Sequence, residues 1–266
     1  MDRRYVVGLA VALVATGIGA LAFTAVWSPH ATVPDSDRPY PAGAGPHHIN
    51  FSALGTDDTN VSHTPREYWD SYAIVYTAPP ERRLVEGDYY IDSATGAIIA
   101  QRWQNATVYI NGTTYAFVQP ADSIPEHQRE QFASDPQFVY DDTTDAYYRY
   151  DPHYGQIAPT NIGRHTMILE AYAWEATDTT THHGVPVITY RATGTRPDSQ
   201  VPPTIDGTLR LGVEDGVVYA FDLTLDAGEE TYHYTYDVAP APFPEHEWVD
   251  TARNLAANAT DSRSEQ

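Results

Sequence analysis

The sequence predicts an α+β fold built on one large antiparallel β-sheet. The first observation is a period of two in the apolar residues along 209–238, which predicts three consecutive strands with one buried face. The second is a similar alternation along residues 87–118, where glycines separate short apolar runs. The third is the order of elements, because strands are followed by helices and then by strands again, and that order is typical of α+β folds.

A long apolar segment comes first in the chain. Residues 5–27 contain no charged side chain, and as a helix they would span roughly 34 Å, more than the bilayer core of about 30 Å. Arg3 and Arg4 precede them, so we expect a transmembrane helix with its N-terminus inside the cell and the rest of the chain outside. The alternative is a signal peptide that is cleaved near the small residues at 20–22 or 24–25, which would give a secreted protein.

Composition sets the expected domain boundaries. Residues 1–27 form the membrane segment, and residues 28–47 form a linker that is rich in Pro and Gly and is extended by its prolines. Residues 48–250 are expected to fold outside the cell. Residues 251–266 are expected to form a polar C-terminal tail.

The charge of the chain is strongly acidic. It contains 36 Asp and Glu against 15 basic residues, all of them Arg, and its formal net charge is −21. Such a surface repels nucleic acid, so we expect no nucleic-acid partner. Concentrated salt screens the repulsion between the acids, so the absence of Lys and the high charge together indicate a haloarchaeal origin. The chain has no Cys, which excludes disulfides, thiolate metal sites and a lipid-modified Cys.

The first half of the folded part is predicted to be mostly strand. A helical turn begins at Thr64, which is placed to cap it, and a strand follows over 72–77, where aromatic and β-branched residues are frequent. Further strands are expected over 87–92, 97–103, 107–110 and 114–118.

The second half is predicted to begin with helices and to end with strands. Helices are expected over 126–133 and 161–175, the latter capped by Asn161. A hairpin follows over 174–193 and turns at His182, His183 and Gly184. The closing strands are expected over 209–213, 217–225 and 231–238.

Five N-x-S/T sequons agree with export and are candidate glycosylation sites. They begin at Asn50, Asn60, Asn105, Asn111 and Asn258. Asn111 and Gly112 also fit a type I′ hairpin turn, and both roles stay open at that position.

From the sequence we expect no bound metal, no cofactor and no catalytic activity. His47-His48 and His182-His183 are adjacent pairs, and neighbours on a strand point to opposite faces, so neither pair is expected to bind a metal together. The acids between 141 and 151 do not have the spacing of an EF-hand loop, so we interpret them as a solvated loop. No nucleophile elbow, P-loop, zinc-protease motif or dinucleotide fingerprint occurs.

Three segments resemble a known family. They are Gly-Val-Pro-Val-Ile-Thr-Tyr-Arg-Ala-Thr-Gly at 184–194, Glu-Asp-Gly-Val-Val-Tyr at 214–219 and Tyr-His-Tyr-Thr-Tyr-Asp-Val at 232–238, with Pro244 and Trp248 after them. They resemble exported haloarchaeal proteins with a LolA/LppX-like fold, over roughly residues 48–250. The resemblance implies a strongly curved half-barrel sheet with helices on its concave face and an apolar cavity between them. Members with this fold carry lipids or lipoprotein acyl chains, and most haloarchaeal members are anchored by an N-terminal Cys that this chain lacks.

The resemblance and the aromatic strands together predict a binding module for a hydrophobic ligand such as an acyl or isoprenoid chain. The residues expected to line its cavity are Ile91, Ile98, Trp103, Tyr219, Phe221, Leu223, Tyr232 and Tyr234. The same residues could instead fill an ordinary core. Two other functions stay open, a structural or protein-interaction module of the cell envelope and an uncharacterised hydrolase.

Overall fold

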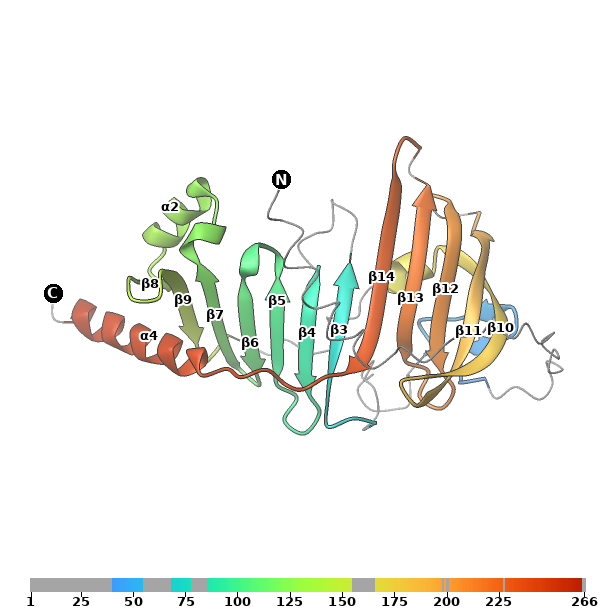
Figure 1. Cartoon of the computed structure of the whole chain (residues 1–266), viewed down its shortest axis with the longest axis horizontal. Helices are drawn as coiled ribbons and strands as arrows, with labels where there is room; N and C mark the ends of the chain where they lie inside the picture. The colour runs from blue at the N-terminus through green and yellow to red at the C-terminus, as the bar shows by residue number, and fades with distance from the viewer. Residues whose placement is uncertain are drawn as a thin grey trace, which may run out of the picture. The chain divides into compact units, whose positions relative to one another are not determined.

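The structure is a computed structural model that describes residues 40–54, 68–77, 86–154, 166–197, 199, 201–226 and 228–264. These residues form a 12-stranded antiparallel sheet in the order β10-β11-β12-β13-β14-β3-β4-β5-β6-β7-β9-β8, and a separate pair of strands, β1 and β2. Figure 1 shows the strands side by side, with β14 next to β3. The sheet is open, and β10 and β8 are its two edge strands. The prediction of one large antiparallel sheet is confirmed.

The strands form two meanders along the chain, and the first departs from simple meander order at its end, where β9 lies between β7 and β8. The first contains β3 (Ser71–Thr77), β4 (Gly87–Asp92), β5 (Ile98–Arg102), β6 (Thr107–Asn111), β7 (Thr114–Pro120), β8 (Phe138–Asp141) and β9 (Ala146–Asp151). The second contains β10 (Tyr172–His182), β11 (Val185–Thr195), β12 (Thr204–Gly212), β13 (Val218–Asp226) and β14 (Thr231–Pro240). Pairing between β14 and β3 joins the two meanders into one sheet.

The remaining elements are short, except for the last helix. They are β1 (Ala44–Gly45), β2 (His48–Ile49), the 3₁₀ turns η4 (Trp103–Asn105) and η5 (Ala121–Ser123), and the helices α2 (Glu126–Ser134), α3 (Thr166–Leu169) and α4 (Trp248–Ser264). Among the residues that the structure describes, no helix has the length and apolar character needed to cross a bilayer. The predicted membrane segment 5–27 lies outside these residues.

One face of the sheet carries the main apolar core, and the period of two explains why. On β13, Tyr219, Phe221 and Leu223 are buried, whereas Asp222 between them is exposed. The cluster to which they belong extends across the sheet from β10 to β7. The three predicted C-terminal strands are therefore confirmed, with the expected face inward.

The opposite face carries a smaller apolar cluster under α4. Ile99, Tyr109 and Ala116 lie on this face, and Val249 and Ala252 of α4 pack into the same cluster. The segment expected as a polar tail, 251–266, is thus largely helix and is part of the fold. The helix was missed because its apolar residues form a narrow stripe among Ala, Asn, Thr and Asp.

Two further predictions differ from the structure. The helix expected over 161–175 is wrong at its end, because α3 stops at Leu169 and Tyr172 already begins β10. Tyr172 and Trp174 are both buried with Ala173 less buried between them, which is the alternation of a strand. The expected linker is also too long, because β1 lies inside it and pairs with β2.

The predicted turn at Asn111 and Gly112 is shifted by one residue. Asn111 pairs with Thr114 across the hairpin, so the turn consists of Gly112 and Thr113. Gly112 has a φ of +56°, and a glycine with positive φ at the first turn position is typical of a type II′ hairpin. Asn111 is the last residue of β6 instead.

Candidate functional site

The tip of the β10–β11 hairpin brings two histidines together. His182 pairs with Val185, so the turn between them is His183 and Gly184, with φ values of +47° and +90°. Because His183 is in the turn and not in the strand, its ring is not directed to the opposite face. The two imidazole centroids are 4.5 Å apart. The argument that adjacent histidines must diverge is therefore wrong for this pair.

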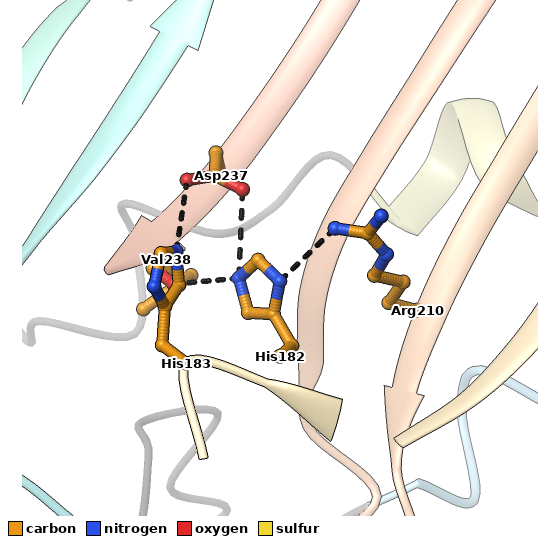
Figure 2. A network of polar contacts seen from close by, with 5 residues as sticks. All are labelled: His182, His183, Arg210, Asp237 and Val238. Atoms are coloured by element: carbon orange, nitrogen blue, oxygen red, sulfur yellow. Dashed lines mark hydrogen bonds and ion pairs between the residues drawn. The ribbon is translucent and has the colours of Figure 1, made fainter. Parts of the chain in front are cut away.

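The hydrogen bonds of His182 fix its tautomer (Figure 2). Nη1 of Arg210 lies 3.1 Å from Nδ1 of His182, and a guanidinium can only donate, so Nδ1 accepts. Nε2 then carries the proton and donates to the carbonyl oxygen of Val238 at 2.8 Å. Burial lowers the pKa of the His182 imidazole, although the Val238 carbonyl and the carboxylate of Asp237 oppose that effect. His182 is therefore neutral, with both ring nitrogens in use.

Asp237 faces both histidines. Its Oδ1 is 3.4 Å from Nε2 of His182, and its Oδ2 is 4.0 Å from Nε2 of His183. Asp237 pairs with Ala220 at one end of the β13–β14 ladder, and Val238 is the next residue of β14 beyond that end. The His182 side chain therefore contacts β14 where its pairing with β13 ends, and the network connects the hairpin tip to β12 and β14.

The donor atoms of His182, His183 and Asp237 all lie within 4.8 Å of one another. Two imidazoles and a carboxylate are a ligand set that suits Zn²⁺. A metal-bound histidine, however, normally donates its other N–H to an acceptor, and here that nitrogen faces the Arg210 donor. No lone pair is left on Nε2, and the guanidinium would repel a cation. The residues do not fit a resident metal ion, so we interpret the network of His182, His183, Arg210, Asp237 and Val238 as a structural one that links β10, β12 and β14.

Seven of the eight predicted cavity residues belong to the apolar cluster on one face of the sheet. Six are 4% exposed or less: Ile91, Ile98, Tyr219, Phe221, Leu223 and Tyr234. Tyr232 is partly buried against the same cluster, and the side chain of Trp103 lies outside the described residues. Three pockets of about 690, 520 and 160 Å³ are lined by described residues, and none of the three is lined by this set.

One predicted residue has a partner of its own. The hydroxyl of Tyr219 donates to Oδ2 of Asp215 at 2.7 Å, and the backbone N–H of Val217 donates to Oδ1 at 3.1 Å. Burial and the Asp215 carboxylate raise the pKa of the Tyr219 phenol, which keeps it neutral. The Tyr219 hydroxyl therefore secures the β12–β13 turn and is not available to a ligand.

Tyr72 is not among the predicted cavity residues, and its hydroxyl differs from that of Tyr219 in its hydrogen bonding. Tyr72 on β3 is 2% exposed and lies directly opposite Ile91 on β4. Its hydroxyl is buried and has no hydrogen-bond partner among the described residues. The alternation of β3 places Tyr72 on the apolar face, but only the packing shows that its hydroxyl is unsatisfied.

The sequons differ in exposure. Asn50, Asn105 and Asn258 are exposed, and Asn60 lies outside the described residues. Asn111 is half-buried, and its side-chain amide donates to the hydroxyl of Tyr109 at 3.2 Å.

The other candidate charges are engaged in local contacts. In the acidic loop, Asp141 accepts from the Thr144 hydroxyl at 2.8 Å, and Asp145 accepts from the Tyr140 hydroxyl at 2.8 Å. The bond from Thr144 lowers the pKa of Asp141. His47 lies 3.6 Å from Glu175 in an exposed pair.

The chain matches no family model, and no curated protein matches its sequence. Any assignment of function must therefore come from the chain's own residues.

Proposed function

We propose that this protein binds a hydrophobic ligand, with an acyl or isoprenoid chain, against the apolar face of its sheet. It would do so outside the cytoplasm, either anchored by residues 5–27 or secreted, and without catalysis. The proposal includes the architecture that the LolA-like resemblance implies, in which the sheet curves as a half-barrel and its concave face holds helices and ligand.

The observation that carries the proposal is the continuity of the apolar face. Tyr72, Ile91 and Ile98 are directly opposite one another on β3, β4 and β5. Apolar neighbours continue on both sides as far as β10 and β7. Tyr72, Ile91 and Ile98 are 3% exposed or less, although the described helices that reach this face are short. α3 has four residues, and no residue of α2 is buried.

A ligand chain would supply cover of the same kind as a core side chain. Each buried CH₂ group contributes about 0.8 kcal/mol, so an acyl or prenyl chain gains affinity from apolar area alone. A site of this type needs few polar groups and no particular motif. That agrees with a chain that has no catalytic signature in its sequence.

The test is organic extraction of the full-length protein, purified at high salt from a haloarchaeal host, followed by mass spectrometry of the extract. We expect one lipid class at a fixed stoichiometry to the protein. Ile98 and Ile99 provide a matched pair, because both are 1% exposed but they belong to the clusters on opposite faces. Ile98→Val should change the lipid content, whereas Ile99→Val should not. A lipid-free protein that also takes up none on incubation would exclude this function.

A protein-interaction module is the second candidate, and the edge strand β10 favours it. Its residues from Thr177 to Thr181 are exposed, and an open strand edge can pair with an added strand. However, its ladder with β11 has irregularities at Ala173/Trp174 and Ala176/Asp178, and such bulges discourage pairing at an edge. We therefore rank this function second.

A further inference from the structure

The hydroxyl of Tyr72 differs from those of Tyr172 and Tyr219, two tyrosines that are buried in the same apolar cluster. The hydroxyls of Tyr172 and Tyr219 have acceptors, the carbonyl of Pro202 at 2.9 Å and the carboxylate of Asp215 at 2.7 Å. Tyr72 is equally well buried, yet its hydroxyl finds no acceptor within the described part of the chain. Leaving a buried donor unsatisfied costs about 1–3 kcal/mol, so such a group needs an explanation.

A pocket lies beside the rings that surround Tyr72. It has a volume of about 520 Å³ and is lined by Tyr68, Trp69, Asp70, Ser71, Pro240, Ala241 and Pro242. The Trp69 ring centroid is 6.3 Å from that of Tyr72 and 6.1 Å from that of Tyr219. Trp69 and Tyr68 are partly exposed, so they contact both the pocket and the buried rings. Movement of these two aromatic side chains would connect the pocket with the apolar face.

The charges around this position select the type of head group. Asp70 lines the pocket, and the carboxylate of Asp215 is held by Tyr219 beside the same rings. Both are acids, and a buried carboxylate or phosphate on the ligand would need a cation that these residues do not supply. Burial raises the pKa of the Tyr72 phenol, which therefore remains a proton donor. A neutral oxygen acceptor fits this donor.

We infer that Tyr72 donates a hydrogen bond to the head of the ligand, and that the ligand is a neutral lipid whose head carries a carbonyl or ether oxygen. The lipid enters beside Trp69 from the pocket, and its chain lies along the row of Ile91 and Ile98. This inference rests on the proposed function, because it assigns the head-group position of the same site.

The experiment compares two probes on the full-length protein. One is a geranylated benzoquinone, and the other is a geranylated benzene of similar size without carbonyl groups. Wild type should prefer the quinone. Tyr72→Phe removes only the hydroxyl, so it should weaken quinone binding about 2- to 12-fold, the value of one hydrogen bond, and leave binding of the hydrocarbon unchanged.

Tyr172→Phe is the matched control. It removes a phenol hydroxyl from the same apolar cluster, but one that already bonds to Pro202. It should lower the thermal stability and leave the preference for quinone intact, whereas Tyr72→Phe should leave thermal stability unchanged or raised.

The outcomes separate this inference from the proposed function. If wild type binds quinone and Tyr72→Phe binds it equally well, only a water molecule occupies the space at the hydroxyl, and the head-group assignment is overturned alone. Equal weakening for both probes also overturns it, because Tyr72 would then act by shape. If wild type binds neither probe, the proposed function fails and the head-group assignment fails with it.

Discussion

Nε2 of His182 lies 2.8 Å from the carbonyl oxygen of Val238, 56 residues further along the chain. This contact joins the tip of the β10–β11 hairpin to β14, the strand that connects the two meanders (Figure 2). Arg210 on β12 holds the other ring nitrogen at 3.1 Å. One imidazole thus links three strands that lie apart in the order of the sheet.

Replacing His182 should destabilise the fold more than replacing its neighbour. His182→Ala leaves the Val238 carbonyl without its donor and opens a cavity, so we expect a loss of about 1–3 kcal/mol in the free energy of unfolding. His183→Ala removes a half-exposed side chain, with an effect within about 0.5 kcal/mol. Urea denaturation at fixed high salt measures both losses. Equal losses would show that the His182 hydrogen bonds contribute nothing to the free energy of unfolding.

Stability should depend on pH through His182. Its folded pKa is depressed by burial below the ordinary value of 6.5, so the unfolded chain binds the proton more readily than the folded one. The contribution is therefore fully present above pH 6.5, and it is lost as the pH falls through the folded pKa.

The measurement is the difference in melting temperature between wild type and His182→Gln across this pH range. Asp237, His183 and Arg210 face the side chain at position 182 and are present in both proteins, so the difference reports mainly on His182. The advantage of wild type should shrink toward acid pH. An advantage that stays constant from pH 8 to pH 5 would contradict the depressed pKa of His182 in the folded protein.

Arg210 should prevent metal binding at the hairpin tip. In Arg210→Met the Nδ1 atom of His182 can carry the proton, which frees Nε2 as a ligand beside His183 and Asp237. We expect Zn²⁺ to raise the melting temperature of Arg210→Met and not that of wild type. Arg210→Met combined with His183→Ala is the control and should lose the response. Saturable stabilisation of wild type by Zn²⁺ that requires His182 would disprove the tautomer argument.

The sequence predicted the strands better than the helices because strand signals are local. The alternation of Tyr219, Phe221 and Leu223 is sufficient to define β13 and its inward face. α4 contributes Trp248, Val249, Ala252 and Leu255 to the second apolar cluster, and no alternation in the sequence predicts that cluster. Tyr172 and Trp174 were read as helical because a preceding Asn cap favoured that period.

The candidate sites depended on contacts that no local pattern contains. Strand geometry predicts that the side chains of His182 and His183 point to opposite faces, but the positive φ of His183 brings the two rings together. Tyr72 was assigned correctly to a strand, whereas its unsatisfied hydroxyl follows from packing against Trp69 and Ile91. Residue type and period predict which face a side chain occupies, and they do not predict its hydrogen-bond partner.

Two hairpin turns of the sheet share one backbone pattern but differ in side chains. The N–H of Asp92 donates to the carbonyl of Ala97 at 3.0 Å, and the N–H of Gly212 donates to the carbonyl of Val217 at 2.8 Å. In the first turn the carboxylate is on Asp92 and accepts from Thr95. In the second turn Gly212 occupies the position that corresponds to Asp92, and the carboxylate is on Asp215, three residues after Gly212.

The position of the Asp215 carboxylate explains why residue 212 is a glycine. A Cβ atom on Gly212 would overlap Oδ1 of Asp215 and approach the ring of Tyr219. Gly212→Ala should therefore displace the carboxylate from the N–H of Val217 and from the Tyr219 hydroxyl, at a cost of about 1–3 kcal/mol. Gly212→Ala combined with Asp215→Ala removes the overlap along with the carboxylate, so its cost should be less than the sum of the two single substitutions. Chemical denaturation of the three variants gives this coupling, and strict additivity would mean that the glycine is required for another reason.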